Sequence, residues 1–305
     1  MNVVVRLVRT ALLGVAAGLC APAGAAAIDV TDDTGAHVVL AAPARRIVSL
    51  APHTTELLFA AGAGERIAAT VDYSDYPEAA KALPRVGSSS LLDMERLVAL
   101  KPDLVVVWRS GTSPARVESL RALGIPIYLN EPHTLADIPA ALVKLGTLAG
   151  TGDTARRAAA AFDARMAALQ ARYAGRRPVR LFWQIWAQPL MTVNGRHVIS
   201  DAVRLCGGVN IFAALPPLVP AVTVESVVAA NPEAIVTTGN DAAASADDGL
   251  AQWRALPRLA ATARGNLIVL EAETIHRQAP RVLDGVATLC ARLDEVRSRG
   301  DAVRR

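Results

Sequence analysis

The sequence predicts an α/β protein in which two Rossmann-like lobes, each with a mainly parallel sheet, are joined by a single long backbone helix. Continuous apolar strands alternate with helices in two separate runs, which is typical of parallel sheets covered on both faces. A long helical pattern lies between the runs, and one helix–strand unit occurs in both. The chain has 305 residues, enough for two domains with separate cores.

The N-terminus has the pattern of a secretory signal peptide. Arg6 and Arg9 precede an apolar run that ends near Leu19, and small residues suited to cleavage follow. We expect residues 1–27 to be removed, leaving a protein in the periplasm. The alternatives are a membrane anchor, for which the apolar run is short, and a lipoprotein attached through Cys20.

The first lobe is expected over residues 28–150. It opens with a hairpin that turns at Asp-Thr-Gly, and Thr54 or Thr55 is expected to cap the first helix, which stops at Gly62 or Gly64. The expected strands occupy residues 46–50, 66–71, 103–108 and 125–130. The expected helices occupy residues 51–64, a segment around Glu95, 113–124 and 134–146.

A single helix is expected to connect the lobes within residues 151–177. From Asp153 to about Ala174, apolar residues recur at helical spacing, and Asp153 can cap the start. About 22 residues would span roughly 33 Å, which suits a strut between lobes. The alternative is a helix packed within one larger domain.

The second lobe is expected over residues 178–305, where the alternation resumes. Its expected strands occupy residues 179–186, 233–239 and 266–272. Its expected helices occupy residues 198–208, a segment around Glu225, and the chain from about Pro280 onward.

One helix–strand unit is repeated in the two lobes. Glu95 precedes Pro102 by seven residues, and Glu225 precedes Pro232 by seven, 130 residues further along. The repeat marks equivalent positions in two similar lobes. For each glutamate taken alone, the alternative is a solvated side chain that the helix dipole favours.

Charge and cysteine usage bound the class of protein. The formal net charge is +4, or about +2 without the signal, and no RNA- or DNA-binding motif is present, so we expect no nucleic-acid partner. Loss of Cys20 leaves Cys206 and Cys290. An even pair in an exported protein favours a disulfide, with two buried free thiols as the alternative.

Aromatic and polar residues follow several expected strands, which is where open parallel sheets bind ligands. Facing one another across two lobes, they would line a cleft for a sizeable organic ligand. For any one of them, the alternative is a half-buried loop residue. The candidates are Pro52, His53, Tyr73, Trp108, Arg109 and His133 in the first lobe, and Trp183, Trp186, Glu273, His276 and Arg277 in the second.

No catalytic residue is assigned, because the sequence has no nucleophile elbow, Walker loop, dinucleotide fingerprint or H-E-x-x-H motif. We therefore expect a binding protein rather than an enzyme, with an exported two-lobed enzyme as the alternative from another class. We assign no cofactor and no metal site. The metal alternatives are an ion held by His53, His133 and His276, or haem ligated by Tyr73 or a histidine.

Five segments between about Arg45 and Leu293 carry a family resemblance: RIVSLAPHTTELLFAAG, YSDYP, MERLVALKPDLVVVWRSG, LCGGVNIF and RQAPRV. They resemble the periplasmic cobalamin-binding components of vitamin B12 ABC importers. More broadly, they resemble the helical-backbone substrate-binding proteins for corrinoids, haem and siderophores.

The resemblance implies a small-molecule metal chelate held between two lobes on one rigid helix. It implies that Tyr73 and Trp108 stack on the ligand, that Pro52 and His53 line the first-lobe wall, and that Glu273 and Arg277 contact polar edges. It also matches Cys206 and Cys290 to a family disulfide. Six residues before each of the two repeated glutamates, the family has a tryptophan. This chain has Ser89 and Val219 there, and Trp186 would compensate for the missing rings. The departures leave room for a precursor corrinoid, haem or a ferric siderophore.

The resemblance also gives the repeated glutamates a role. Glu95 and Glu225 would project from the lobe surfaces and pair with arginines on the two subunits of an ABC permease dimer, which works with its ATPase subunits. Such pairing steers and registers docking. We expect the binding protein itself to be a monomer.

Overall fold

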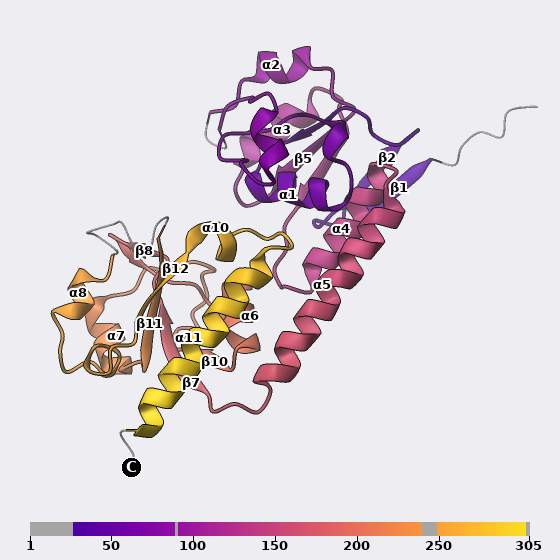
Figure 1. Ribbon diagram of the computed structural model, residues 1–305. Coiled ribbons are helices and arrows are strands. Elements are labelled where there is room, and N and C mark those ends of the chain that lie inside the picture. The colour runs from indigo at the N-terminus through magenta and orange to yellow at the C-terminus, as the bar shows by residue number, and fades with distance from the viewer. Residues whose placement is uncertain (1–26, 89–90, 240–248, 303–305) are drawn as a thin grey trace, which may run out of the picture.

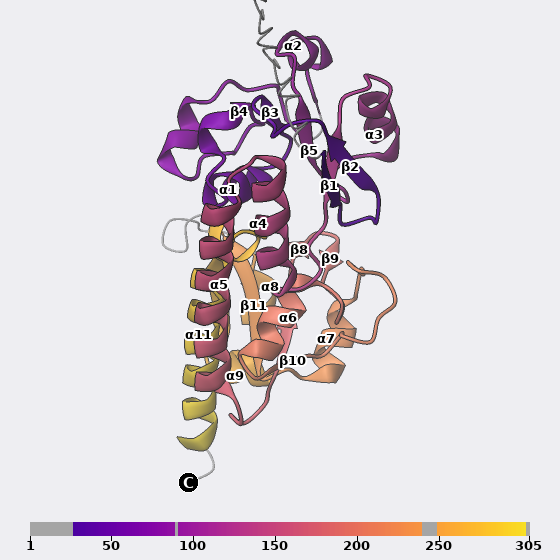
Figure 2. The ribbon, with the colours of Figure 1, turned by 90° about the vertical axis from the view of Figure 1, so that its right-hand side faces the viewer.

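The computed structural model describes residues 27–88, 91–239 and 249–302, and it has two lobes placed along a long helix (Figures 1 and 2). This arrangement confirms the predicted fold class. The predicted signal peptide, apart from Ala27, lies outside the described residues. In the described part of the chain, no helix combines the length and apolar character needed to cross a bilayer.

The N-terminal lobe is built on a four-stranded parallel sheet in the order β4-β3-β5-β6. A separate antiparallel hairpin of β1 (Ile28–Thr31) and β2 (His37–Leu40) precedes it. The sheet strands are β3 (Ile47–Ser49), β4 (Ile67–Ala69), β5 (Leu104–Trp108) and β6 (Ile127–Asn130). The helices are α1 (Pro52–Ala60), α2 (Met94–Ala99), α3 (Pro114–Arg121) and α4 (Asp137–Leu148).

The C-terminal lobe has a second four-stranded parallel sheet in the order β10-β7-β11-β12. Its strands are β7 (Val179–Trp183), β10 (Gly208–Asn210), β11 (Ala234–Gly239) and β12 (Leu267–Glu271), with a small hairpin of β8 (Trp186–Ala187) and β9 (Leu190–Met191). Its helices are α6 (Val198–Leu205), α7 (Val224–Ala230), α8 (Ala251–Arg254), α9 (Ala260–Ala263), α10 (Ala272–Ile275) and α11 (Val282–Ala302).

The two sheets repeat one topology, because in each the second strand of the chain lies outside the first and the third and fourth follow on the other side. Side-chain contacts repeat as well. The guanidinium of Arg46 donates to the carbonyl of Leu100 (2.8 Å), which follows α2. The guanidinium of Arg180 donates to the carbonyl of Ala230 (3.0 Å), which ends α7. The repeat seen in the sequence is therefore a repeat of structure.

Helix α5 (Gly152–Tyr173) is the connection between the lobes. Its 22 residues correspond to roughly 33 Å. In Figures 1 and 2 it runs beside α11, to which an ion pair of Arg165 and Asp284 ties it. The largest core cluster passes from the N-terminal lobe through Ala155, Ala159 and Phe162 of α5 into the C-terminal lobe. The lobes therefore share packed core along this helix.

The disulfide predicted between Cys206 and Cys290 is confirmed. Cys206 lies directly after α6 and Cys290 lies within α11, and both are fully buried. The bond crosslinks two helices that cover the same lobe.

The predicted cap of α1 and the predicted end of β7 were wrong. Helix α1 begins at Pro52 and has no side-chain cap, because the residue at its cap position is Ala51. Thr54 and Thr55 lie inside the helix, and their hydroxyls donate back to the carbonyl of Ala51. Proline is well suited to the first helical position, where no intrahelical N–H bond is needed. The strand expected over 179–186 ends at Trp183, and Trp186 belongs to the β8–β9 hairpin.

Candidate functional site

The first wall of the candidate site lies at the switch point of the N-terminal sheet. Strands β3 and β5 are adjacent, and the chain leaves them toward opposite edges of the sheet, to β4 and β6. Such a point is where doubly wound sheets bind ligands. His53, at the start of α1, meets Trp108, at the end of β5, in an edge-to-face contact with ring centroids 5.4 Å apart.

His53 is an uncharged member of this wall. Its side chain is 3% exposed, and its Nε2 atom lies 3.2 Å from Oδ1 of Asn130. Burial is the main cause that lowers the pKa of His53 to about 4; the hydrogen bond to Asn130 opposes it, and the positive charge of Arg277 acts in the same direction as burial.

The loop after β4 adds two tyrosines to the first lobe. Tyr73 has a positive φ of 64° and is 75% exposed, so its ring stands in solvent. A non-glycine residue in this conformation carries backbone strain, which is frequent at binding sites. Tyr76 lies under the guanidinium of Arg281, whose Cζ atom is 4.4 Å from the ring centroid. This loop therefore also approaches the second lobe.

The second wall is formed by α10 and the segment that leads into α11. Arg277 donates to Glu273 from Nε (3.1 Å) and Nη2 (2.5 Å). Glu273 remains 45% exposed and Arg277 17% exposed. The pair thus offers a half-exposed carboxylate and an oriented guanidinium to a polar ligand edge.

A buried ion pair joins the two walls. Arg281 donates to Glu56 of α1 from Nε (2.8 Å) and Nη2 (2.7 Å). Burial raises the pKa of Glu56, against the hydrogen bonds and positive charge of Arg281. Glu56 is 4% exposed, so the bridge is shielded from water.

The remaining predicted residues are placed around these walls. Pro52 is the first residue of α1, the backbone N–H of Arg109 donates to the carbonyl of Asn130 (3.1 Å), and Trp186 is 63% exposed. Among the described residues, Tyr73, Arg109 and Trp186 make no hydrogen bond, ion pair or ring contact with another predicted ligand residue.

The inclusion of Trp183 among the cleft aromatics was wrong. Its side chain is fully buried and belongs to the core that the sheet forms with α6 and α11. A tryptophan at the last position of an inner strand packs inward when its side of the pleat faces the helices. Trp186, three residues later, is the exposed aromatic of this segment.

No metal-binding cluster is found in residues 27–88, 91–239 and 249–302, where no three His, Cys, Asp or Glu side chains gather suitably. The histidines that could have met on an ion lie in different settings. His53 is buried against Trp108, His133 is exposed, and His276 is half-buried with Nε2 at 3.5 Å from Thr238.

The structure adds four residues that the sequence interpretation did not single out. Two weak signals were present: Glu56 is an acid inside the apolar run of α1, and Asn130 is a polar residue at the end of a buried strand. The other two, Tyr76 and Arg281, lie in the motifs YSDYP and RQAPRV. Glu56, Tyr76 and Arg281 owe their role to how the lobes meet, whereas Asn130 acts on His53 within the first lobe.

The two repeated glutamates occupy matching surface positions. Glu95 lies in the first turn of α2 and Glu225 in the first turn of α7, and both are exposed. Asp93 and Thr223 cap the helices by accepting the N–H of Arg96 (2.9 Å) and of Ser226 (3.2 Å). Hydrogen bonds from its own N–H and from Thr223 lower the pKa of Glu225.

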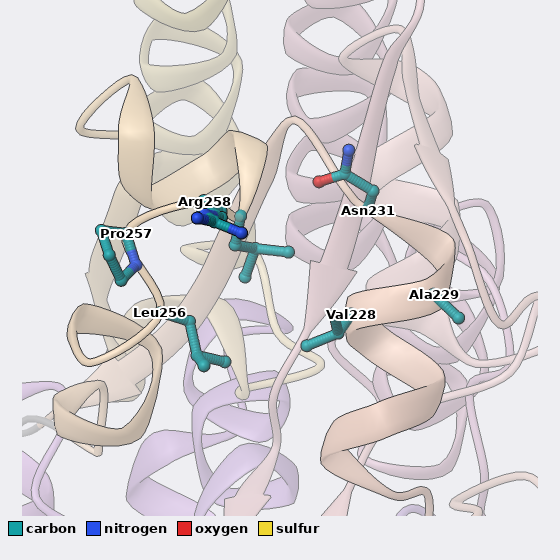
Figure 3. Close-up of a pocket in the computed structure, with 7 residues that line it drawn as sticks. Val228, Ala229, Asn231, Leu256, Pro257 and Arg258 are labelled. Atoms are coloured by element: carbon teal, nitrogen blue, oxygen red, sulfur yellow. The ribbon is translucent and has the colours of Figure 1, made fainter.

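A pocket of about 540 Å³ adjoins α7 on the C-terminal lobe (Figure 3). Figure 3 shows the end of α7 on one side and the segment between α8 and α9 on the other. The side chain of Asn231 ties the two sides by accepting the N–H of Ala260 (2.9 Å). Val228, one turn after Glu225, is 43% exposed at its edge. The lining residues are Val228, Ala229, Asn231, Leu256, Pro257, Arg258 and Leu259.

The chain matches a family model described as periplasmic binding protein over residues 47–274. This chain belongs to the periplasmic binding protein family. The match covers both sheets and the connecting helix, and it confirms the family resemblance drawn from the sequence motifs.

Two curated relatives cover most of this periplasmic binding protein. The vitamin B12-binding protein of Vibrio cholerae serotype O1 (strain ATCC 39541) is 36% identical over 252 residues, which is 82% of this chain and 90% of the relative. The vitamin B12-binding protein of Yersinia pestis (strain Pestoides F) is 38% identical over 253 residues, which is 83% of this chain and 88% of the relative.

Solved structures share the fold of this periplasmic binding protein. The periplasmic vitamin B12 binding protein of Vibrio cholerae has a TM-score of 0.76 at 35% identity, covering 84% of this chain and 98% of that one. The periplasmic heme-binding protein RhuT from Roseiflexus sp. RS-1 has a TM-score of 0.73 at 23% identity, covering 83% and 98%. The second likeness is one of fold.

Proposed function

We propose that this periplasmic binding protein captures a corrinoid such as cobalamin between its lobes and delivers it to an ABC import permease. The observation that carries the proposal is the His53–Trp108 pair at the N-terminal switch point, with the half-exposed Glu273–Arg277 pair on the wall of the other lobe. The identity to vitamin B12-binding proteins supports a corrinoid as the ligand class.

The proposed roles follow from side-chain chemistry. Trp108, Tyr73 and Trp186 offer ring faces to a large flat macrocycle. Pro52 and neutral His53 line the first-lobe wall. A corrin ring carries amide groups on its edge, which Glu273 can bind as an acceptor, and Arg277 and Arg109 as donors. These groups bind and orient a ligand, and the proposal contains no catalytic step.

The proposal places the mature protein, from about residue 28, in the periplasm after removal of the N-terminal signal. Glu95 and Glu225 would then contact one permease subunit each. Their matched placement at the starts of α2 and α7 supports this role. A permease built from two like subunits needs a similar handle on each lobe.

Calorimetric titration of residues 28–305 with cyanocobalamin tests the proposal. We expect micromolar or tighter binding, weakened roughly 10–100-fold in Trp108→Ala by loss of a stacked ring. The matched control is Leu123→Ala, which removes an exposed apolar side chain between α3 and β6 of the same lobe. No binding of cyanocobalamin at tens of micromolar would sink the cobalamin assignment. A Soret shift with haemin would then point to haem.

A further inference from the structure

We infer that Asp33, in the turn of the N-terminal hairpin, is a positioning residue for the ligand site, because through Asn130 it fixes which nitrogen of His53 carries the proton. The consequence for ligand binding rests on the proposed function. The consequence for the imidazole does not, since it concerns the protein without ligand.

Asp33 is surrounded by hydrogen-bond donors. Its Oδ1 atom accepts from Nζ of Lys144 (2.9 Å) and from the hydroxyl of Tyr128 (3.1 Å). Its Oδ2 atom accepts from the N–H of Glu131 (2.8 Å) and from Nδ2 of Asn130 (2.9 Å). Burial, with the adjacent Asp33 charge, raises the pKa of Tyr128, so this hydroxyl stays protonated. An ionised carboxylate can only accept hydrogen bonds, and each oxygen of Asp33 accepts two.

The carboxylate of Asp33 decides the orientation of the Asn130 amide. An amide can usually be reversed, with oxygen and nitrogen exchanged, and its neighbours must settle the choice. Here the reversed orientation would set the Asn130 oxygen against the Oδ2 atom of Asp33. The amide nitrogen therefore faces Asp33, and the oxygen faces His53.

The Asn130 oxygen in turn decides the tautomer of His53. Oδ1 of Asn130 lies 3.2 Å from Nε2 of His53, and both residues are buried. An amide oxygen can only accept, so Nε2 must carry the hydrogen. In the neutral imidazole, Nδ1 is then the acceptor. The order Asp33, Asn130, His53 is a chain of hydrogen bonds that ends on the ring packed against Trp108.

The hairpin acts on the ligand site through Asn130. Within the described residues, it makes no hydrogen bond or ion pair with any of the predicted ligand residues. The N–H of Asp33 donates to the carbonyl of Leu129 (3.1 Å), and Oδ2 of Asp32 accepts the N–H of Leu129 (3.3 Å). These bonds fasten the turn to the end of β6, one residue before Asn130. A residue that hydrogen-bonds to a binding group from behind, without contacting the ligand, can fix the orientation of that group.

Long-range ¹H–¹⁵N NMR of the histidine rings tests the inference on residues 28–305 without ligand. We expect the His53 signals, identified by their loss in His53→Gln, to show the Nε2–H tautomer at pH 7. In Asp33→Asn the remaining oxygen should stay with the ammonium of Lys144, so the new amide nitrogen faces Nδ2 of Asn130. The Asn130 amide then reverses to accept from it, and a measurable share of His53 changes to the Nδ1–H tautomer.

Asp32→Asn is the matched control. Asp32 also holds the turn, by accepting the N–H groups of Thr34 (2.8 Å) and Ala36 (3.0 Å), but it does not touch Asn130. We expect this variant to keep the wild-type tautomer. Cyanocobalamin affinity should fall roughly two- to tenfold in Asp33→Asn, the value of one oriented hydrogen bond, and stay within about twofold in Asp32→Asn.

An Nδ1–H or doubly protonated His53 in the wild type, or an unchanged tautomer in Asp33→Asn, would overturn the inference. An equal tautomer change in both variants would also overturn it, because the effect would then belong to the hairpin as a whole. Failure of the wild type to bind cyanocobalamin, with the tautomers as expected, would overturn the proposed function alone.

Discussion

Glu56 and Arg281 lie 225 residues apart in the chain and form a two-pronged ion pair between the lobes, with N–O distances of 2.8 and 2.7 Å. Glu56 is 4% exposed and Arg281 16% exposed. The guanidinium also covers the ring of Tyr76. This pair therefore links the two walls of the candidate site through two hydrogen bonds that are shielded from water.

Breaking this pair should cost more than breaking an exposed one. In Arg281→Met, Glu56 would remain buried without its partner, and we expect the free energy of unfolding to fall by about 3–5 kcal/mol. The matched control is Arg165→Met, which breaks the half-exposed Arg165–Asp284 pair and should cost about 0–1 kcal/mol. Urea denaturation measures both. Equal losses would contradict a shielded bridge.

Gly111 should control the position of Trp108. A Cβ atom added at Gly111 would lie 1.9 Å from Cε3 of the Trp108 ring, so Gly111→Ala must displace the indole. We expect cyanocobalamin affinity to fall roughly tenfold while the fold persists. In the control, Gly152→Ala, the nearest atom is the movable end of Arg156 at 3.2 Å. Calorimetry reports affinity, and similar affinities for both variants would contradict the prediction.

Acid should destabilise the protein partly through His197. Burial, with the charges of His276 and His133, lowers the pKa of His197 to about 4. The unfolded chain, with a histidine pKa near 6.5, binds a proton that the folded protein excludes between these values. Stability from this group is therefore complete above about pH 6.5, and about 1–2 kcal/mol is lost by pH 5.

The variant that tests this is His197→Asn. Nδ1 of His197 accepts the N–H of Ile199 (3.1 Å) at the start of α6, and asparagine is a good substitute at a helix cap. We expect the loss of unfolding free energy between pH 7 and pH 5 to be smaller in the variant by about 1–2 kcal/mol. The urea titrations at pH 7 supply the reference, and an unchanged loss would rule out a contribution of His197.

Reversing charge at both matched glutamates should uncouple uptake from ligand binding. In Glu95→Lys with Glu225→Lys, we expect cobalamin uptake by cells to be abolished and affinity in solution to stay within about twofold. Glu118→Lys with Glu295→Lys makes the same charge change at exposed glutamates of α3 and α11. The control should support normal uptake. Lost affinity in the first variant would refute a docking role.

The sheets could be predicted from the sequence because their strands are buried on both faces. Val105, Val106 and Val107 are fully buried, and such a run identifies an inner strand without any knowledge of the fold. The connecting helix was predicted to within about one residue, but Asp153 is its second residue and does not cap it, since the residue at the cap position is Thr151. Two lobes with one topology followed from repeated local patterns.

Contacts that depend on tertiary placement could not be predicted in this way. Thr54 and Thr55 resemble helix caps in sequence, yet they lie within α1, where their hydroxyls join a buried network with Ser49. Trp183 and Trp186 look alike as strand-end aromatics, and only the side of the pleat separates core from surface. The Glu56–Arg281 bridge requires the relative placement of two lobes, which no local pattern contains.

The spacing of these contacts along the chain sets an order of assembly. Asp33, Asn130 and His53 all come from the first 130 residues, so these hydrogen bonds need no residue of the second lobe. Glu56 must wait for Arg281, near the end of the chain. A chain that stops short of residue 281 would therefore have one finished wall and a buried acid, Glu56, without its partner.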